Sequence, residues 1–262
     1  MSRPYHGMGK PFTAPPMASP DKIDHAITIL QAAQAHGPAI HTNSFGPEGV
    51  VLTHLITEHA PDIATASLDT GRLPEQTYAV ADALRQRYGL VIDWWFPDAE
   101  SLGNFTQEHG VNAFYNSVEL RRACCGIRKV EPLGRMLVGK LAWITGRRRQ
   151  QGLKRAALPE REWDEQRGIL KFNPLAEWTH DDVWTFIRAH AIPYNALHDQ
   201  GYPSIGCAPC TRAITVGEDP RAGRWWWEQD STRECGLHGP ARPAAEDETT
   251  LQPAEAIPDV GL

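Results

Sequence analysis

The sequence predicts an α/β protein, with a parallel β-sheet sandwiched by helices, on three observations. Short apolar segments alternate with segments of helical periodicity between Pro38 and Phe172, which is the order that βαβ units produce. Hydrophobic residues make up 41% of the chain and charged residues 22%, as in soluble folded proteins. The 262 residues are enough for one large domain with a sizeable core.

Each element has a local signal. The first helix is expected to begin at Asp21, which would cap it, and to stop at Gly37. Thr179 is expected to cap the last helix. Strands are expected at residues 38–42, 62–68, 90–96, 141–145 and 169–172, and further helices at residues 50–59, 73–88 and 178–190.

The two ends of the chain differ from the centre. The first twenty residues contain five prolines and little periodicity, which predicts a poorly ordered leader over residues 1–20. After His238 the chain is rich in Pro, Ala, Glu and Thr, which predicts a disordered tail over residues 239–262. We therefore expect a single domain over residues 21–238, whose Cys-rich part beyond Ile192 wraps around a site instead of adding strands.

The charge excludes some classes of partner. A net charge of −6 argues against a general binder of nucleic acid or of anionic membranes, because both need a positive field. No apolar run approaches the roughly 18 residues of a membrane span, and the N-terminus lacks the apolar core of a signal peptide. A cytoplasmic location is expected by default.

Four of the five cysteines form a candidate metal site. Cys124 and Cys125 are adjacent, and Cys207 and Cys210 have the spacing C-x-x-C, so together they match a tetrahedral zinc site or a 4Fe-4S cluster. Adjacent side chains on a helix point about 100° apart, which crowds one zinc ion but suits different irons of one cluster. The pattern favours iron–sulfur; zinc and ordinary buried cysteines remain the alternatives.

The fifth cysteine, Cys235, lies between Arg233 and His238 just before the predicted tail. Nearby cations and an imidazole lower the pKa of a thiol, and a nucleophile also needs access. Cys235 is therefore a candidate nucleophile, and a surface cysteine without a role is the alternative.

The turns that follow the strands are candidate anion sites, because ligands of parallel sheets bind at the carboxyl ends of the strands. The turn over residues 44–49 opens a helix, where backbone N–H groups favour a phosphate, although it lacks a Walker lysine. An ordinary turn is the alternative. Basic residues also cluster after the strand at 141–145 and beside the cysteine pair, which indicates either a solvated face or a polyanionic small molecule: Arg147, Arg148, Arg149, Lys154 and Arg155, with Arg128 and Lys129.

Three consecutive tryptophans, Trp225, Trp226 and Trp227, would point around a helix and cannot all face one core. They either anchor the C-terminal segment to the body of the domain or form a docking surface for a partner.

Taken together, these motifs resemble the assimilatory adenosine 5′-phosphosulfate reductases of the iron–sulfur type, within the wider adenosine and 3′-phosphoadenosine phosphosulfate reductase family. Many relatives carry Glu-Asp where this chain has Glu48-Gly49. The matching segments follow one another at residues 44–46 (SFG), 68–73 (LDTGRL), 124–133 (CCGIRKVEPL), 143–148 (WITGRR), 206–212 (GCAPCTR), 223–228 (GRWWWE) and 234–238 (ECGLH).

The resemblance implies an adenine-nucleotide-binding fold of the adenine nucleotide α-hydrolase type and an enzyme of sulfate assimilation. Its substrate would be adenosine 5′-phosphosulfate, reduced to sulfite and AMP through an S-sulfocysteine, with thioredoxin or a similar dithiol protein as reductant. The implied 4Fe-4S cluster would bind Cys124, Cys125, Cys207 and Cys210, and Cys235 would be the nucleophile. Lys129 would lie between cluster and substrate, and Arg221 and Arg224 would hold the phosphosulfate. The other expected substrate contacts are Ser44, Phe45, Gly46, Asp69, Thr70, Gly71, Arg72, Gly146, Arg147 and His238.

Three other functions stay open. Enzymes restricted to 3′-phosphoadenosine phosphosulfate typically lack the four cluster cysteines, although use of both nucleotides is compatible with the motifs. An ATP-dependent tRNA-thiolating enzyme would carry a Ser-Gly-Gly-x-Asp-Ser loop in place of the segment at 44–49. A metal-stabilised binding module without activity would leave Cys235 without a purpose.

Overall fold

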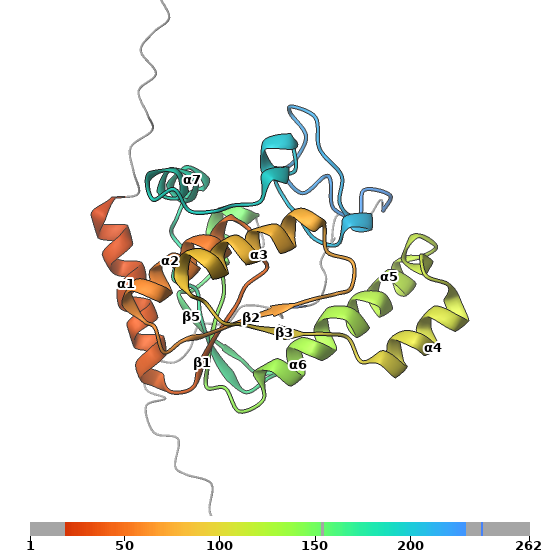
Figure 1. Ribbon diagram of the computed structural model, residues 1–262, viewed down its shortest axis with the longest axis horizontal. Coiled ribbons are helices and arrows are strands. Elements are labelled where there is room, and N and C mark those ends of the chain that lie inside the picture. The colour runs from red at the N-terminus through yellow and green to blue at the C-terminus, as the bar shows by residue number, and fades with distance from the viewer. Residues whose placement is uncertain (1–18, 153–154, 229–236, 238–262) are drawn as a thin grey trace, which may run out of the picture.

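The computed structural model describes residues 19–152, 155–228 and 237, and a six-stranded sheet forms its centre (Figure 1). The strand order is β3-β2-β1-β4-β6-β5, and every neighbouring pair is parallel except β5 and β6. The strands are β1 (Ala39–Thr42), β2 (Ala64–Leu68), β3 (Ile92–Trp95), β4 (Ala142–Ile144), β5 (Arg161–Asp164) and β6 (Ile169–Phe172).

Helices cover both faces of the sheet. The α-helices are α1 (Pro20–His36), α2 (Pro47–His59), α3 (Glu75–Tyr88), α4 (Ala99–His109), α5 (Val118–Cys125), α6 (Glu131–Leu137) and α7 (His180–Ala189). The shorter helical turns are η1 (Ala113–Tyr115), η2 (Gly126–Val130), η3 (Arg149–Gln151), η5 (Ala196–Gln200) and η6 (Ala208–Cys210), and η2 is a π-turn that joins α5 to α6.

Strand alternation divides the core into two layers. Ala39, Ala142 and Ile144 face the larger cluster, which α1, α2, α3 and α7 complete. Ile40 and Trp143 face the opposite cluster, beneath α6. Successive strand residues point to opposite faces, so the apolar runs of these strands reflect burial on both sides, as expected for a parallel sheet.

The strand order reverses between β1 and β4. The β1–α2 connection leads toward β2 and β3, whereas β4 is followed by β6 on its other side. In open α/β sheets, ligands bind outside the carboxyl ends of the strands at such a reversal. The topology therefore directs attention to the loops that follow β1 and β4.

The predicted fold is confirmed, with corrections at the helix starts. Ser19, and not Asp21, caps α1, because its side chain accepts a hydrogen bond from the Lys22 backbone. The helix predicted from Val50 begins at Pro47, since proline is favoured in a first helical turn. Gly37 and Thr179 end and cap their helices as expected.

The segment beyond Ile192 adds no strand to the sheet within the residues described. Trp225–Trp227 lie in a turn and not on a helix as expected. Most of the predicted leader and all of the predicted tail lie outside the described residues. No described helix has the length and hydropathy to cross a membrane.

Candidate active site

The loop after β1 is held in an unusual backbone conformation. Phe45 is buried and has φ 58°, a left-handed value that is uncommon for residues other than glycine. The Asn43 side chain stabilises it: Oδ1 accepts a hydrogen bond from the Phe45 backbone N–H at 2.7 Å, and Nδ2 donates to Thr53 Oγ1 at 2.9 Å. Gly46 follows as the N-cap of α2 and provides no side-chain cap, so the first N–H groups of α2 are available to a ligand oxygen.

The same loop requires a glycine at position 49. A Cβ added at Gly49 would lie 2.2 Å from Asn43 Oδ1, which is closer than any real contact. The glycine thus makes room for the buried amide of Asn43, and the two residues belong together.

The loop after β4 lies beside the loop after β1, where the strand order reverses. Gly146 approaches α2 so closely that an added Cβ would lie 2.9 Å from the Cβ of Glu48. Arg148, also in this loop, donates to the Glu48 carboxylate at 2.7 and 2.8 Å, and both side chains are largely buried. Ser44, Phe45, Gly46 and Gly146, which the sequence assigned to one site, therefore lie on two loops that meet where the strand order reverses.

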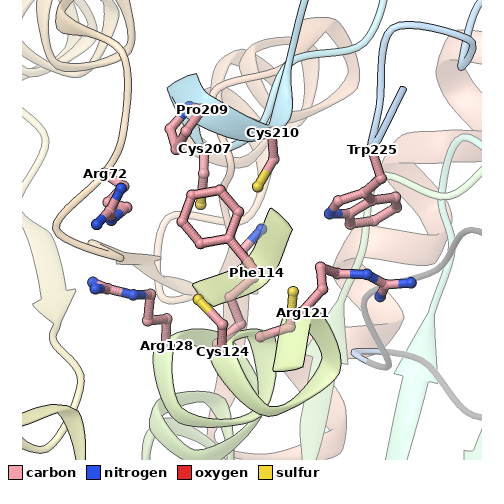
Figure 2. Close-up of a pocket in the computed structure, with 11 residues that line it drawn as sticks. Arg72, Phe114, Arg121, Cys124, Arg128, Cys207, Pro209, Cys210 and Trp225 are labelled. Atoms are coloured by element: carbon pink, nitrogen blue, oxygen red, sulfur yellow. The ribbon is translucent and has the colours of Figure 1, made fainter. Parts of the chain in front are cut away.

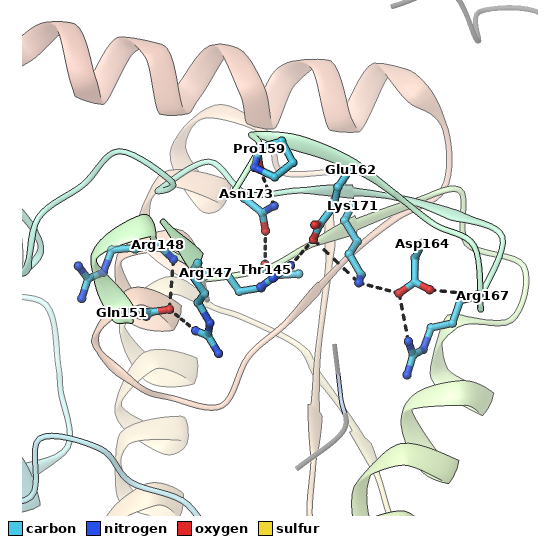
Figure 3. A network of polar contacts seen from close by, with 11 residues as sticks. Thr145, Arg147, Arg148, Gln151, Pro159, Glu162, Asp164, Arg167, Lys171 and Asn173 are labelled. Carbon is cyan, nitrogen blue, oxygen red and sulfur yellow. Dashed lines mark hydrogen bonds and ion pairs between the residues drawn. The ribbon is translucent and has the colours of Figure 1, made fainter. Parts of the chain in front are cut away.

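Arg147 points to the sheet and not into solvent. It pairs with Glu162 on β5, and Lys171 on β6 lies 2.6 Å from Asp164 and 3.9 Å from Glu162 (Figure 3). Burial lowers the pKa of Lys171, against the opposing effect of Asp164. The network ties the end of β4 to the antiparallel hairpin β5–β6, so the position of Gly146 depends on buried charges behind it.

The loop after β2 contacts the segment that carries the C-x-x-C cysteines. Asp69 Oδ1 accepts hydrogen bonds from the Gly71 backbone at 2.8 Å and from Tyr78 at 2.9 Å, and Gly71 adopts φ 68°. Thr70 Oγ1 lies 3.2 Å from Cys207 Sγ. The Arg72 carbonyl accepts the Ala208 N–H at 2.8 Å. One loop thus borders both the sheet edge and the C-x-x-C turn.

The cysteines of the Cys124-Cys125 and C-x-x-C motifs lie together in one buried pocket. Cys124 and Cys125 end α5, Cys207 precedes η6 and Cys210 ends it, and all four are free of disulfides. Figure 2 shows the sulfur atoms of Cys124, Cys207 and Cys210 pointing into the space between α5 and η6. The pocket holds about 350 Å³ outside the protein atoms, including some open solvent, and is lined by Arg72, Phe114, Arg121, Cys124, Cys125, Arg128, Lys129, Cys207, Pro209, Cys210 and Trp225.

Cations surround these sulfurs. Burial raises the pKa of Cys207, but Lys129, the Thr70 hydroxyl and Arg224 outweigh it, so that this pKa lies below its ordinary value. Burial raises the pKa of Cys210 to about 12, with a further contribution from Cys207. Four soft donors in a cationic, poorly hydrated pocket are suited to bind as thiolates to iron or zinc. Among the described residues, no three His, Cys or carboxylate side chains are already grouped tightly enough to hold one ion.

The sequence analysis missed the ion pair that closes this pocket. Arg121 Nε and Nη2 each donate to the Glu228 carboxylate at 2.8 Å, with side chains 2% and 3% exposed. The Arg121 guanidinium also lies 4.7 Å from the centre of the Trp225 ring. The pair joins α5 to the segment after Arg224 across 107 residues of sequence, a separation at which no local pattern exists.

Of the other residues predicted to contact the substrate or to react with it, some lie near the cysteine pocket and some lie outside the described residues. Lys129 lines the cysteine pocket, and Arg224 lies over the Trp225 ring at 4.9 Å and against Gly206, where an added Cβ would be 2.1 Å from Nη2. The Arg221 backbone is held by Asp219 at 2.7 Å. Cys235 and His238 lie outside the described residues.

Known proteins resemble this chain over most of its length. A family model described as the phosphoadenosine phosphosulfate reductase domain matches residues 38–213. The adenosine 5′-phosphosulfate reductase of Allochromatium vinosum is 48% identical over 231 residues, which cover 86% of this chain and 90% of that protein. The protein of the same name from Burkholderia cepacia is 50% identical over 218 residues, covering 83% of this chain and 87% of that one.

Solved structures agree at the level of the fold. The phosphoadenylyl-sulfate reductase of Candida auris, in a phosphate complex, superimposes with a TM-score of 0.62 at 30% identity, covering 76% of this chain and 99% of that one. The FMN adenylyltransferase of Candida glabrata has a TM-score of 0.54 at 16% identity, covering 87% of this chain and 79% of that one, which shows a shared fold alone. With the family model matching well over half of its length and relatives near 50% identity, this chain is an enzyme that belongs to the phosphoadenosine phosphosulfate reductase family.

Proposed function

We propose that this enzyme reduces adenosine 5′-phosphosulfate to sulfite and AMP, with a dithiol protein such as thioredoxin as electron donor. One observation carries the proposal: the loop after β2 borders both the strand ends and the cationic cysteine pocket, through the contact of Thr70 with Cys207 at 3.2 Å. A nucleotide at the strand ends would then present its phosphosulfate toward Lys129 and Arg224. The names of the relatives support the same substrate.

The residues of the loops after β1 and β4 would bind and orient the nucleotide. The N-terminus of α2 and the backbone around Gly46 would receive its oxygens, and the close packing of Gly146 against Glu48 would hold the two loops together. Lys129, Arg221 and Arg224 would neutralise the phosphosulfate, because an anion in a partly dry site requires cations.

The chemical step would belong to Cys235. Its thiolate attacks the sulfur of the sulfuryl group, the bond from that sulfur to the phosphate oxygen breaks, and AMP leaves with the electron pair. Cys235 then carries a sulfonate as S-sulfocysteine. A thiolate of the reductant attacks Cys235 Sγ and displaces sulfite, and the second thiol of the reductant resolves the mixed disulfide. The two thiols become a disulfide as the substrate sulfur gains two electrons.

The residues present fit an iron–sulfur cluster. Cys124, Cys125, Cys207 and Cys210 would hold it, because four cysteine thiolates are the ligand set of such a cluster. All four line one pocket, whereas no three ligating side chains of the described residues are grouped tightly enough for a single ion. When bound, the cluster would supply fixed charge and would tie α5 to the C-terminal segment. Lys129, one residue beyond Arg128 in the π-turn, would be oriented between it and the substrate.

Unphosphorylated substrate is favoured over its 3′-phosphorylated form by the pairing of three consecutive arginines. Arg147 pairs with Glu162, Arg148 with Glu48 and Arg149 with Glu177. A 3′-phosphate that bound at any of these three arginines would have to displace its carboxylate. We place the catalytic domain within residues 21–238 and the enzyme in the cytoplasm, where dithiol reductants are kept reduced.

The experiment is a sulfite assay with reduced thioredoxin and each nucleotide. We expect sulfite and AMP in equal amounts from adenosine 5′-phosphosulfate, with kcat/KM at least tenfold above that for the 3′-phosphorylated nucleotide. Release of sulfite only from the latter would overturn the substrate assignment, and pyrophosphate release from ATP would indicate an adenylating enzyme instead.

A further inference from the structure

The three consecutive tryptophans have three different environments. Trp225 is 1% exposed and packs among the four cysteines, and Trp227 packs against the same cluster from its edge. Trp226 is 47% exposed. An exposed tryptophan on a segment whose neighbours are buried is unusual, because this side chain buries the largest apolar area of all when it is packed.

Trp226 is nevertheless held in place by an aromatic stack. Its ring meets Trp227 edge-on at 5.6 Å between centroids, and Trp227 meets Tyr115 at 4.4 Å. Tyr115 is 41% exposed, and its hydroxyl donates to the Pro209 carbonyl at 2.8 Å. Two residues after Trp226, Glu228 is fixed by Arg121. Trp226 and Tyr115 are thus two exposed aromatic side chains held by Trp227, which itself packs against the cluster formed by Phe114, Trp225 and the cysteines.

The position of Trp226 along the chain limits what can meet it. Cys235 follows Glu228 by seven residues, which span at most roughly 25 Å when fully extended. On the proposed mechanism, a protein thiol must reach Cys235 to displace sulfite, so the body of that protein comes within reach of Trp226. Rigid aromatic side chains are the residues that most often anchor protein interfaces.

We propose that Trp226, supported by Tyr115, is the docking anchor for the dithiol protein that reduces the enzyme. The partner would present its reactive thiol within an uncharged, apolar patch, because Trp226 offers apolar contact and one indole N–H. This inference rests on the proposed function, and it assigns to one tryptophan the docking role and to Trp225 the anchoring role that the sequence left as alternatives.

The test compares a protein reductant with a small one. In Trp226→Ala, the KM for thioredoxin should rise at least tenfold, while the KM for adenosine 5′-phosphosulfate, the iron content and turnover with dithiothreitol stay within twofold of the wild type. Dithiothreitol reaches the sulfonate without docking, so it reports on fold and chemistry alone. Phe96→Ala is the matched control, since Phe96 is aromatic, 55% exposed and outside the stack. It should change neither the KM for thioredoxin nor the turnover with dithiothreitol.

Each other outcome contradicts the docking role. An unchanged KM for thioredoxin in Trp226→Ala would overturn it, and so would an equal loss with dithiothreitol or an equal loss in Phe96→Ala. Concentration-dependent dimerisation that disappears in Trp226→Ala would assign Trp226 to an interface with a second copy of the chain. Failure of the proposed function is a separate result, because the wild type would then release no sulfite with either reductant.

Discussion

Glu228 and Arg121 form a buried ion pair beside the cysteine pocket. Its contribution to stability can be measured by removing one partner. Removing one partner of a buried ion pair leaves an uncompensated charge, at a cost of about 3–5 kcal/mol. Glu228→Ala should therefore lower the free energy of unfolding by about 3 kcal/mol or more in anaerobic urea denaturation.

The matched control is Glu177→Ala, because Glu177 pairs with Arg149 and the two side chains are 52% and 38% exposed. Solvent-exposed pairs contribute about 0–1 kcal/mol. Equal losses in the two variants would show that Arg121 and Glu228 are not the buried link between α5 and the C-terminal segment.

Asn43 and Gly49 provide a second residue-level test. Gly49→Ala alone should cost about 1–3 kcal/mol of stability, because the new methyl group would overlap Asn43 Oδ1. In an Asn43→Ala background the overlap is gone, and the same change should be neutral or stabilising, since alanine suits a helix better than glycine by about 0.5–1 kcal/mol. A double-mutant cycle measured by denaturation checks this, and additive effects would argue against the contact.

Residue by residue, local spacing was informative only where chemistry repeats within a few positions. The cysteine pair, the C-x-x-C turn and the loop at Gly46 could be identified because each is contiguous. Arg121 and Glu228 could not, because they are 107 residues apart and each resembles a surface charge in its own segment. The carboxylate partner of Arg148 is likewise remote, 100 residues away in sequence.

At the scale of elements, β1 carries a pH-dependent contribution to stability. Burial lowers the pKa of His41 from its ordinary value of 6.5 to about 3. Between these two pH values the imidazole is protonated in the unfolded chain and neutral in the folded chain. This contribution is complete above pH 6.5 and is lost as the pH falls from 6.5 toward 3, at up to about 1.4 kcal/mol per pH unit.

Denaturation of wild type and His41→Leu between pH 7 and 5 measures this contribution. The variant should lose less stability on acidification, with a difference in slope that approaches about 1.4 kcal/mol per pH unit near pH 5. His54 on α2, whose pKa is lowered by burial and by His190, acts in the same direction and remains in both proteins. Parallel pH curves would contradict the assignment to His41.

The βα alternation up to β3 follows from the sequence because each strand is a short apolar run between helical segments. The helices between β3 and β4 could not be predicted from the sequence in the same way. No residue of α4 is buried, so α4 lacks the apolar stripe that marks a helix, and α5 passes directly into a π-turn at Gly126. Strand β5 has the sequence Arg-Glu-Trp-Asp, which lacks the apolar run of the other strands. Its buried carboxylates, Glu162 and Asp164, are paired with the cations Arg147, Arg167 and Lys171, which lie outside β5.

For the whole molecule, the cysteine pocket predicts a property of the isolated protein. Anaerobic preparations should be brown and contain about four irons per chain, because four thiolates match one 4Fe-4S cluster. Serine at Cys125 or Cys210 should remove both colour and activity. Cys235→Ser should keep the colour and lose turnover. Iron and sulfide analysis with absorption spectra checks this, and stoichiometric zinc without iron would contradict it.

The central claim is that Cys235 forms a covalent bond to the sulfur of the substrate, and mass spectrometry of the peptide containing Cys235 tests it most directly. Incubation of the enzyme with adenosine 5′-phosphosulfate and no reductant should place one sulfonate on Cys235, release one equivalent of AMP and then stop. Added thioredoxin should remove the sulfonate as sulfite. A sulfonate on another cysteine, or sulfite formation by Cys235→Ser, would contradict the account.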